Sequence, residues 1–280
     1  MKRIAIPKEL KQIPSPPKLL FYEGQDLSDL LKRPRIAIVG ARGVTPYGRQ
    51  VTLQLAGKLA EQGIVIISGL ALGVDSLAHQ AALDAGGLTI AVLPGSIDQI
   101  APSSHRWLAE AIISTGGTLV SEYPSGTFAL KHNYIARNRL VAGLAQAVLI
   151  TEAGEKSGSL HTARFALEQG KDVLAVPGNL NSMMSVGTNN LLKSGATLVT
   201  DYTDILHALK LTGHETKAHE VHGRNANEQK VLDLLLQGIT DGEILLIQSE
   251  LGTIEFNQVL TMLELGGKVR ALGANQWGIR

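Results

Sequence analysis

The chain has 280 residues, 44% of them hydrophobic and 18% charged, a balance that supplies a sizeable core and excludes general disorder. There is no cysteine, which excludes disulfides, thiolate metal sites and cysteine nucleophiles. No apolar run approaches the ~20 residues that a membrane-spanning helix needs, and the N-terminus lacks the apolar segment of a secretory signal. We therefore expect a soluble, cytoplasmic protein with no membrane partner.

The net charge of +1 hides an uneven distribution of charge along the chain. Residues 1–58 hold 11 Lys and Arg against 4 Asp and Glu, whereas residues 211–280 hold 6 against 9. A near-neutral total therefore conceals a basic first segment and an acidic tail.

Residues 1–34 are punctuated by prolines and predict an irregular N-terminal extension, with a short helical candidate at 27–32. In residues 35–210, apolar runs alternate with helix-like stretches. The runs predict strands at 36–40, 64–69, 89–95, 118–122, 147–154, 172–178 and 196–201, and helices at 48–61, 75–84, 105–114, 160–169 and 203–210. Such alternation is typical of an α/β fold with a mostly parallel sheet covered on both faces. Most of these strands stop at a glycine, where backbone can approach a ligand at the carboxyl edge of the sheet.

Residues 211–224 are polar and predict a linker. His214, His219 and His222 lie in it without a rigid element or cysteine partners, so we expect no metal site there. Helical candidates follow at 227–236, 241–251 and 255–265, and short strands at 268–272 and 276–280 could form a hairpin. Three helices and a hairpin within residues 225–280 predict a small winged-helix-like domain.

The first predicted strand is followed by the loop Gly40-Ala41-Arg42-Gly43 ahead of a helix. Backbone N–H groups beside the positive end of a helix suit a phosphate. The spacing differs from the dinucleotide pattern G-x-G-x-x-G, and Pro46 interrupts it, so the loop is a weak nucleotide fingerprint. Its distinctive feature is Arg42, a guanidinium placed at the turn itself.

The second loop brings Ser68 and Gly69 to the same edge, where both can offer hydrogen-bond donors to a ligand. Asp75 is predicted to cap the next helix, and His79 lies one turn along the same face. An Asp–His pair could do acid–base chemistry, but a capping Asp bonded to a structural His is the favoured interpretation.

The third cluster places an aromatic ring among cations. Its members are Lys131, Tyr134, Arg137, Asn138 and Arg139, and the surrounding residues 123–151 contain no Asp or Glu. Cations neutralise phosphates while a ring stacks on a base, which is typical of single-strand recognition. Because the two arginines cannot share a helix face, we expect Arg137 to contact the ligand and Arg139 to hold the fold, through Glu122 or Glu152. A basic, solvated helix start remains the alternative interpretation.

Ser157, Gly158 and Ser159 precede another predicted helix and offer donors to an anion, although capping by Ser159 explains part of this pattern. Gly178 is a candidate only because it follows a strand at the same edge. The sequence contains no G-x-x-x-x-G-K-[S/T] loop, no H-E-x-x-H motif and no G-x-S-x-G nucleophile elbow. An ATPase is therefore not expected, and no cofactor is predicted.

These motifs, in this order, resemble the DNA-processing protein A family (DprA, also called Smf). The matching residues are 39–42, 68–75, 78–79, 121–124, 137–139, 152, 157–159, 162–163 and 177–178. The resemblance implies a Rossmann-like core, a homodimer, and binding of single-stranded DNA with loading of the recombinase RecA onto it in natural transformation. It implies no established catalysis.

Position by position, the resemblance implies that Arg42 and Lys131 contact phosphates. Tyr134 stands where such proteins usually carry a Phe that stacks on a base. The sequence departs from the family pattern at Ile135 and Ala136, where a Pro and a variable residue are usual.

We therefore expect a non-catalytic binder of single-stranded DNA. The alternative is an enzyme that uses the same loops, such as a nucleoside-monophosphate glycosidase, with Glu122 or Glu152 as its catalytic carboxylate. A third hypothesis is a transcription regulator that uses the tail. The tail's candidate recognition helix carries two acids and no Lys or Arg, which favours protein contact or self-regulation over duplex binding.

Overall fold

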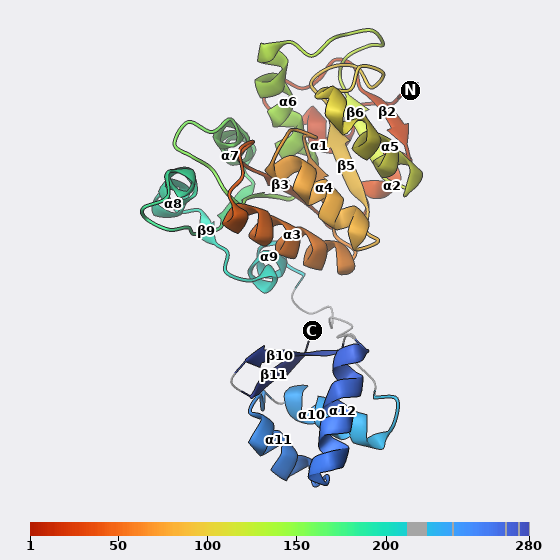
Figure 1. Cartoon of the computed structure of the whole chain (residues 1–280). Coiled ribbons are helices and arrows are strands. Elements are labelled where there is room, and N and C mark those ends of the chain that lie inside the picture. Colours follow the sequence, from red (N-terminus) through yellow and green to blue (C-terminus); the bar gives the residue numbers. More distant parts are fainter. Residues whose placement is uncertain (212–222, 237, 267, 274, 280) are drawn as a thin grey trace. The chain divides into compact units, whose positions relative to one another are not determined.

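The computed structural model describes residues 1–211, 223–236, 238–266, 268–273 and 275–279. The chain forms two compact units, Met1–Gly213 and His214–Arg280 (Figure 1). Most of the predicted linker, with His214, His219 and His222, lies outside the described residues. Among the helices that are described, none is long and apolar enough to cross a membrane.

Within the described residues, the first unit is built on a nine-stranded sheet in the order β1-β2-β6-β5-β4-β3-β7-β8-β9. The strands are β1 (Lys2–Arg3), β2 (Phe21–Gly24), β3 (Arg35–Val39), β4 (Val65–Ser68), β5 (Thr89–Val92), β6 (Thr118–Ser121), β7 (Ala147–Ile150), β8 (Asp172–Ala175) and β9 (Thr197–Leu198). Only the pairs β1–β2 and β2–β6 are antiparallel among these strands. The predicted mostly parallel sheet is therefore confirmed.

Helices cover both faces of this sheet (Figure 1). One face carries α1 (Lys8–Lys11), α6 (Lys131–Leu144) and α7 (Ser159–Glu168), and the other carries α3 (Pro46–Glu61), α4 (Val74–Asp84) and α9 (Tyr202–Ala208). The remaining helices are α2 (Leu27–Leu30), α5 (Arg106–Ser114) and α8 (Val186–Lys193) in the described part of the unit, with 3-10 turns at Ser103–His105 and Met183–Ser185. Along β3, Ala37 and Val39 join the core with α6, whereas Ile36 and Ile38 join the core with α3. Burial on both faces explains why the strands are continuous apolar runs.

Local sequence explains where α3 begins. The Thr45 hydroxyl oxygen accepts a hydrogen bond from the Gly48 N–H at 3.1 Å, and Pro46 occupies the first helical turn. A proline is favourable there because its missing N–H would have had no partner inside the helix. Pro46 thus starts the helix and does not interrupt the preceding loop.

The first 34 residues contribute two strands to the sheet, which the prediction of an irregular extension did not include. β2 pairs with β6 and β1 pairs with β2. The buried Arg35 side chain ties this segment down: Nε donates to the Leu144 carbonyl at 2.6 Å and Nη2 to the Glu9 carboxylate at 3.1 Å. Strands of two to four residues show too little alternation to be detected between prolines.

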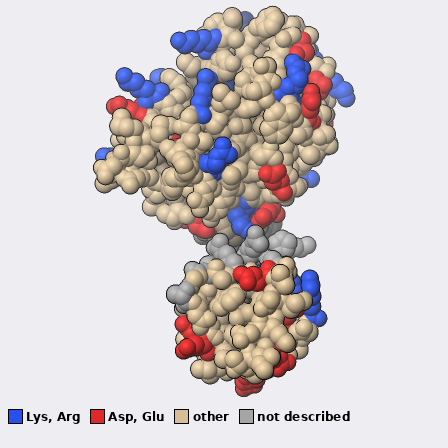
Figure 2. All heavy atoms as spheres, viewed as in Figure 1, with Lys and Arg blue, Asp and Glu red and all other residues tan. Residues whose placement is uncertain are grey.

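The second unit, taken by itself, contains α10 (Ala226–Leu236), α11 (Gly242–Ser249), α12 (Thr253–Leu265) and a hairpin of β10 (Val269–Gly273) and β11 (Gln276–Ile279). Each predicted helix and strand lies close to its expected position. The core holds Leu232, Leu245, Phe256 and Leu263, and acidic side chains occur at several places on the visible surface (Figure 2). The winged-helix assignment stays a prediction.

Candidate nucleic-acid interface

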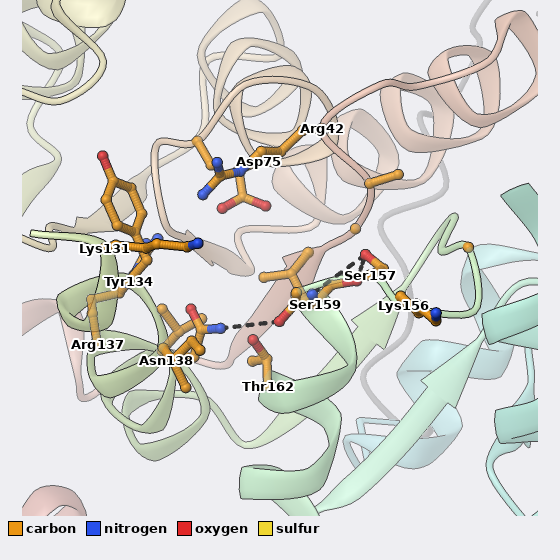
Figure 3. Close-up of a pocket in the computed structure, with 18 of the residues that line it drawn as sticks. Arg42, Asp75, Lys131, Tyr134, Arg137, Asn138, Lys156, Ser157, Ser159 and Thr162 are labelled. Carbon is orange, nitrogen blue, oxygen red and sulfur yellow. Dashed lines mark hydrogen bonds between the residues drawn. The ribbon is translucent and has the colours of Figure 1, made fainter.

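The sheet reverses its order between β3 and β7. From β3 the chain adds strands on one side as far as β6, and it then returns to add β7, β8 and β9 on the other. In open α/β sheets, ligands bind at such a switch point, outside the carboxyl ends of the strands. A cavity of about 790 Å³ lies here, between the loops after β3, β4 and β7 and the first turns of α6 (Figure 3). It is lined by nine of the residues predicted to bind DNA: Gly40, Arg42, Lys131, Tyr134, Arg137, Asn138, Ser157, Gly158 and Ser159.

Arg42 is placed by a loop that is hydrogen-bonded to both neighbouring loops. The Ala41 N–H donates to the Glu152 carbonyl at 2.8 Å, and the Ala41 carbonyl accepts from the Val74 N–H at 3.1 Å. Gly73 has a φ of +82°, and a Cβ there would collide with the Ala41 carbonyl, so only glycine permits this close approach. Arg42 follows directly and is exposed at the cavity.

The buried Glu152 carboxylate holds the same loop from the side of β7. It accepts hydrogen bonds from the Thr45 N–H at 2.8 Å and from the Thr45 hydroxyl. A Cβ on Gly48 would collide with this carboxylate. No ion pair to Glu152 occurs within the described residues, so Glu152 stabilises the loop through Thr45 and not through an arginine.

Lys131 and Tyr134 come from the start of α6. Lys131 is the first residue of the helix and is exposed, and Tyr134 lies one turn later and is half-buried. The guanidinium carbon of Arg42 stands 5.1 Å from the centroid of the Tyr134 ring, which is a cation–π distance. In Figure 3 the side chains of Arg42 and Lys131 extend over the cavity beside this ring.

Arg137 also lies on α6, but it is only 3% exposed and serves the interior. Its Nη1 donates to the Val92 carbonyl at 2.7 Å, and its guanidinium lies against Gly69, where any Cβ would collide with it. Burial lowers the pKa of Arg137, and the Asp75 carboxylate acts in the opposite direction. This side chain joins α6 to the ends of β4 and β5, and although it also lines the cavity, its DNA contact stays a prediction.

Ser68 and Gly69 do not offer free donors, contrary to the prediction. The Ser68 hydroxyl is buried and donates to the Ile38 carbonyl at 2.7 Å, and the Gly69 N–H donates to the Asp75 carboxylate at 3.0 Å. A donor that is already paired inside the protein cannot add a hydrogen bond to a ligand without losing one. Neither residue lines the cavity.

Asp75 and His79 do not form the predicted pair. Gly73 is the N-cap of α4, and Asp75 lies within its first turn. Burial raises the pKa of Asp75, an effect that Arg137 opposes. His79 Nδ1 lies 2.6 Å from the Thr89 hydroxyl, and burial, followed by the charge of Arg137, lowers the pKa of His79 to about 3. His79 is thus a neutral interior residue at ordinary pH.

Arg139 makes a two-point ion pair with Glu122. Nη1 lies 2.8 Å from Oε2, and Nη2 lies 3.0 Å from Oε1. Of the two acids that the sequence offered as partners, Glu122 is the one that Arg139 contacts. The pair joins α6 to the end of β6 and so fixes the helix that carries Lys131.

The loop before α7 forms another wall of the cavity. Asn138 Nδ2 donates to the Gly158 carbonyl at 3.2 Å, and the serines on either side of Gly158 share a hydrogen bond of 2.8 Å. Lys156 and Thr162 also line the cavity, although neither was predicted to bind DNA. Thr162 could have been found because it lies one turn into the helix that follows the Ser-Gly-Ser loop.

Gly43 and Gly178 do not line the cavity. Gly43 is exposed next to Arg42, and a Cβ there would meet nothing within 4 Å. Gly178 is bound to Asn189 of α8 through its N–H at 3.2 Å and its carbonyl at 3.1 Å. Packing against α8 therefore accounts for Gly178, whereas Gly43 stays a candidate contact.

The cavity is rich in cations and poor in carboxylates. Among the described residues that line it, Asp75 is the single acid, against Arg42, Lys131, Arg137 and Lys156. In the same described part of the chain, no cluster of three or more His, Asp or Glu side chains could hold a metal ion. The lining suits an anion.

Residues 2–210 match the family described as DNA recombination-mediator protein A. Protein Smf of Escherichia coli is 41% identical over 208 residues, which are 74% of this chain and 55% of that protein. The DNA processing protein DprA of Streptococcus pneumoniae is 42% identical over 200 residues, which are 71% of this chain and 70% of that protein. The chain thus spans little more than half the length of the Escherichia coli relative.

Two solved structures resemble the first unit. DprA from Streptococcus pneumoniae has a TM-score of 0.67 at 40% identity and covers 72% of this chain and 70% of its own. DprA from Helicobacter pylori, reported for its single-stranded DNA binding mode, has a TM-score of 0.68 at 38% identity and covers 75% of this chain and 95% of its own. These similarities confirm the Rossmann-like fold.

Proposed function

Because the chain belongs to the DNA recombination-mediator protein A family, we propose that it binds single-stranded DNA in the cavity between the ends of β3 and β7. One observation carries the proposal: Arg42, Lys131 and Tyr134, from two different elements, border one cavity whose described lining holds a single carboxylate. The phosphates of a flexible strand need cations, and its unpaired bases need a surface on which to stack.

The contact between Arg42 and Tyr134 supports a preformed stacking surface. The guanidinium and the ring are held together, 5.1 Å apart, before DNA arrives. A base can stack on the open side of the ring or of the guanidinium plane while a neighbouring phosphate pairs with Lys131. Neither contact reads a base edge, so we expect little sequence preference and weaker binding of duplex DNA.

We further propose that a homodimer presents the bound strand to the strand-exchange recombinase RecA. The family description as a recombination mediator supports this step.

We propose a role without catalysis. A glycosidase that acts on nucleoside monophosphates would need an available carboxylate in the cavity. Glu122 is bonded to Arg139 and Glu152 to Thr45, and neither acid lines the cavity. Asp75 does line it but is buried and bonded to a backbone N–H. Release of base or sugar from nucleoside monophosphates by the purified protein would contradict this part of the proposal.

We also propose that the acidic second unit contacts protein and not duplex DNA. α12 exposes Ile254 and Leu265, each 78% accessible, and it carries no Lys or Arg. A helix without cations gains little from phosphate neutralisation. Deleting residues 223–280 should leave oligonucleotide affinity largely unchanged, and a loss of about a hundredfold would contradict this assignment.

The decisive experiment titrates labelled oligo-dT with wild type, Arg42→Ala, Lys131→Ala and Arg33→Ala at two salt concentrations. Arg33 and Arg42 are both exposed and lie just before and just after β3, so Arg33→Ala is a matched control. Arg42→Ala should bind about tenfold more weakly at low salt, and its plot of log affinity against log salt should be flatter by about 0.7, the value for one lost phosphate contact. The proposal fails if Arg42→Ala and Lys131→Ala both bind like wild type.

A further inference from the structure

The segment between β6 and α6, residues 122–130, leads directly into the start of the helix that carries Lys131 and Tyr134 (Figure 1). Phe128 is 69% exposed and Leu130 is 55% exposed. Phe128 packs in none of the described hydrophobic clusters. Single exposed apolar residues are common on protein surfaces, so exposure alone does not mark Phe128 as a binding residue. The argument for binding comes from its fixed backbone and its position relative to the proposed site.

Phe128 is held outward by a well-fixed backbone. On one side, the Thr127 carbonyl accepts hydrogen bonds from the Ser96 N–H at 2.9 Å and from the Ser96 hydroxyl at 3.1 Å. On the other side, Ala129 lies so close to Gly95 that a Cβ on that glycine would be 2.9 Å from the Ala129 nitrogen. A ring presented on an ordered backbone loses little conformational freedom when it meets a ligand.

Phe128 also lies in series with the residues proposed to meet DNA. Its Cα atom can be at most about 11 Å from that of Lys131, three residues later, and Tyr134 follows one helical turn further. Ring, cation and ring thus alternate at a spacing of three residues. From residue 123 to residue 151 there is no Asp or Glu. The acid that contacts the β6–α6 segment is Asp98, whose carboxylate accepts hydrogen bonds from the Ser125 hydroxyl and the Gly126 N–H, each at 3.0 Å.

We infer that Phe128 is a second stacking position, and that the bound strand leaves the cavity over the β6–α6 segment. The inference rests on the proposed function and extends it from one stacked base to two. The occupant is a base of the same single strand, because Phe128 precedes by three residues a cation proposed to neutralise the backbone, and every base has a face to stack. A duplex, whose bases stack on one another, offers no such base.

Phe128→Ala should weaken binding of a long oligo-dT about tenfold, in the range expected for one stacked base. Its salt dependence should match that of wild type, because no phosphate contact is lost. Phe128→Trp should restore the affinity, and binding should quench its added indole fluorescence relative to wild type, which carries Trp107 and Trp277. Leu167→Ala removes a side chain of similar exposure, 61%, from α7 and should bind like wild type.

Arg42→Ala, measured in the same series, separates this inference from the proposed function. If Arg42→Ala is weakened but Phe128→Ala binds like wild type, the second stacking position is refuted and the cavity site stands. If Phe128→Ala, Arg42→Ala and Lys131→Ala all bind like wild type, both ideas fail. If Phe128→Ala keeps its DNA affinity but loses recombinase assembly, the ring belongs to a protein contact, which also overturns the inference. Thermal unfolding of each variant confirms that it is folded.

Discussion

The β3–α3 and β4–α4 loops both follow the carboxyl ends of neighbouring strands, yet the polar groups around them are used in opposite ways. The β3–α3 loop is held by backbone bonds and by Glu152, which leaves Arg42 exposed. In the β4–α4 loop, the Gly69 N–H donates to the Asp75 carboxylate of α4, and Arg137 fills the space between α6 and the sheet. A polar residue at a strand end is thus available to a ligand only where the fold has not already paired it.

The largest loss of stability is expected from replacing Arg137, the buried arginine in this comparison. Arg137→Met removes the donor to the Val92 carbonyl and leaves Asp75 buried without its counter-charge. The free energy of unfolding, measured by urea denaturation, should fall by about 3–5 kcal/mol. Arg42→Met, at an exposed site, should change it by less than about 0.5 kcal/mol. Equal stabilities for the two variants would show that the buried and exposed arginines do not differ in role.

Lys131 tests whether an exposed cation at the cavity contributes to DNA binding. Lys131→Ala should lower oligo-dT affinity about tenfold at low salt and flatten the salt dependence by about 0.7, with stability unchanged. Lys156 lines the same cavity, but in Figure 3 its side chain points away from the other labelled residues. Lys156→Ala should therefore lose less affinity. The reverse ranking in an anisotropy titration would place the path of the strand along α7.

His79 is a buried residue whose environment can be tested through the pH dependence of stability. Its pKa is lowered to about 3, whereas in the unfolded chain it is about 6.5. Between these values the unfolded state binds a proton that the folded state does not. The free energy of unfolding should therefore fall as the pH drops from about 6.5 toward 3, by up to roughly 1 kcal/mol per pH unit.

The matched variant for this pH effect is His79→Gln, which removes the titrating group. In urea denaturation over the same pH range, its stability should depend less steeply on pH than that of wild type. Identical slopes would mean that His79 is protonated in the folded protein.

The smallest effect is expected at Gly43. A Cβ there meets nothing within 4 Å, so Gly43→Ala should change stability by less than about 0.5 kcal/mol. Gly48→Ala, in the first turn of α3, drives a Cβ into the Glu152 carboxylate and should lower the melting temperature clearly. A large loss in Gly43→Ala and none in Gly48→Ala would contradict the packing described for this loop.

Much of the fold could be predicted because its strands are continuous apolar runs that end in turns. Short elements were missed, among them β1, α1 and β2 in the proline-punctuated first segment, and α8. In the site, the exposed positions of Arg42 and Lys131 agree with the sequence-based expectation. The partners of Ser68 and Arg137 could not be predicted, since they are backbone carbonyls 30 and 45 residues away in the chain.

Sequence alone determined which residues reach the carboxyl edge of the sheet, because side-chain hydrophobicity and turn chemistry are local properties that set where each strand and helix ends. Tertiary structure decided which of those residues stay exposed and available to a ligand. Strand order places β7 beside β3, and only then do Glu152 and Thr45 meet, Arg137 lose its water, and Arg42 and Tyr134 stand together at the cavity. Hydrogen bonding and desolvation depend on neighbours that are distant in the chain, so the same residue type can be a free cation in one loop and a structural brace in the next.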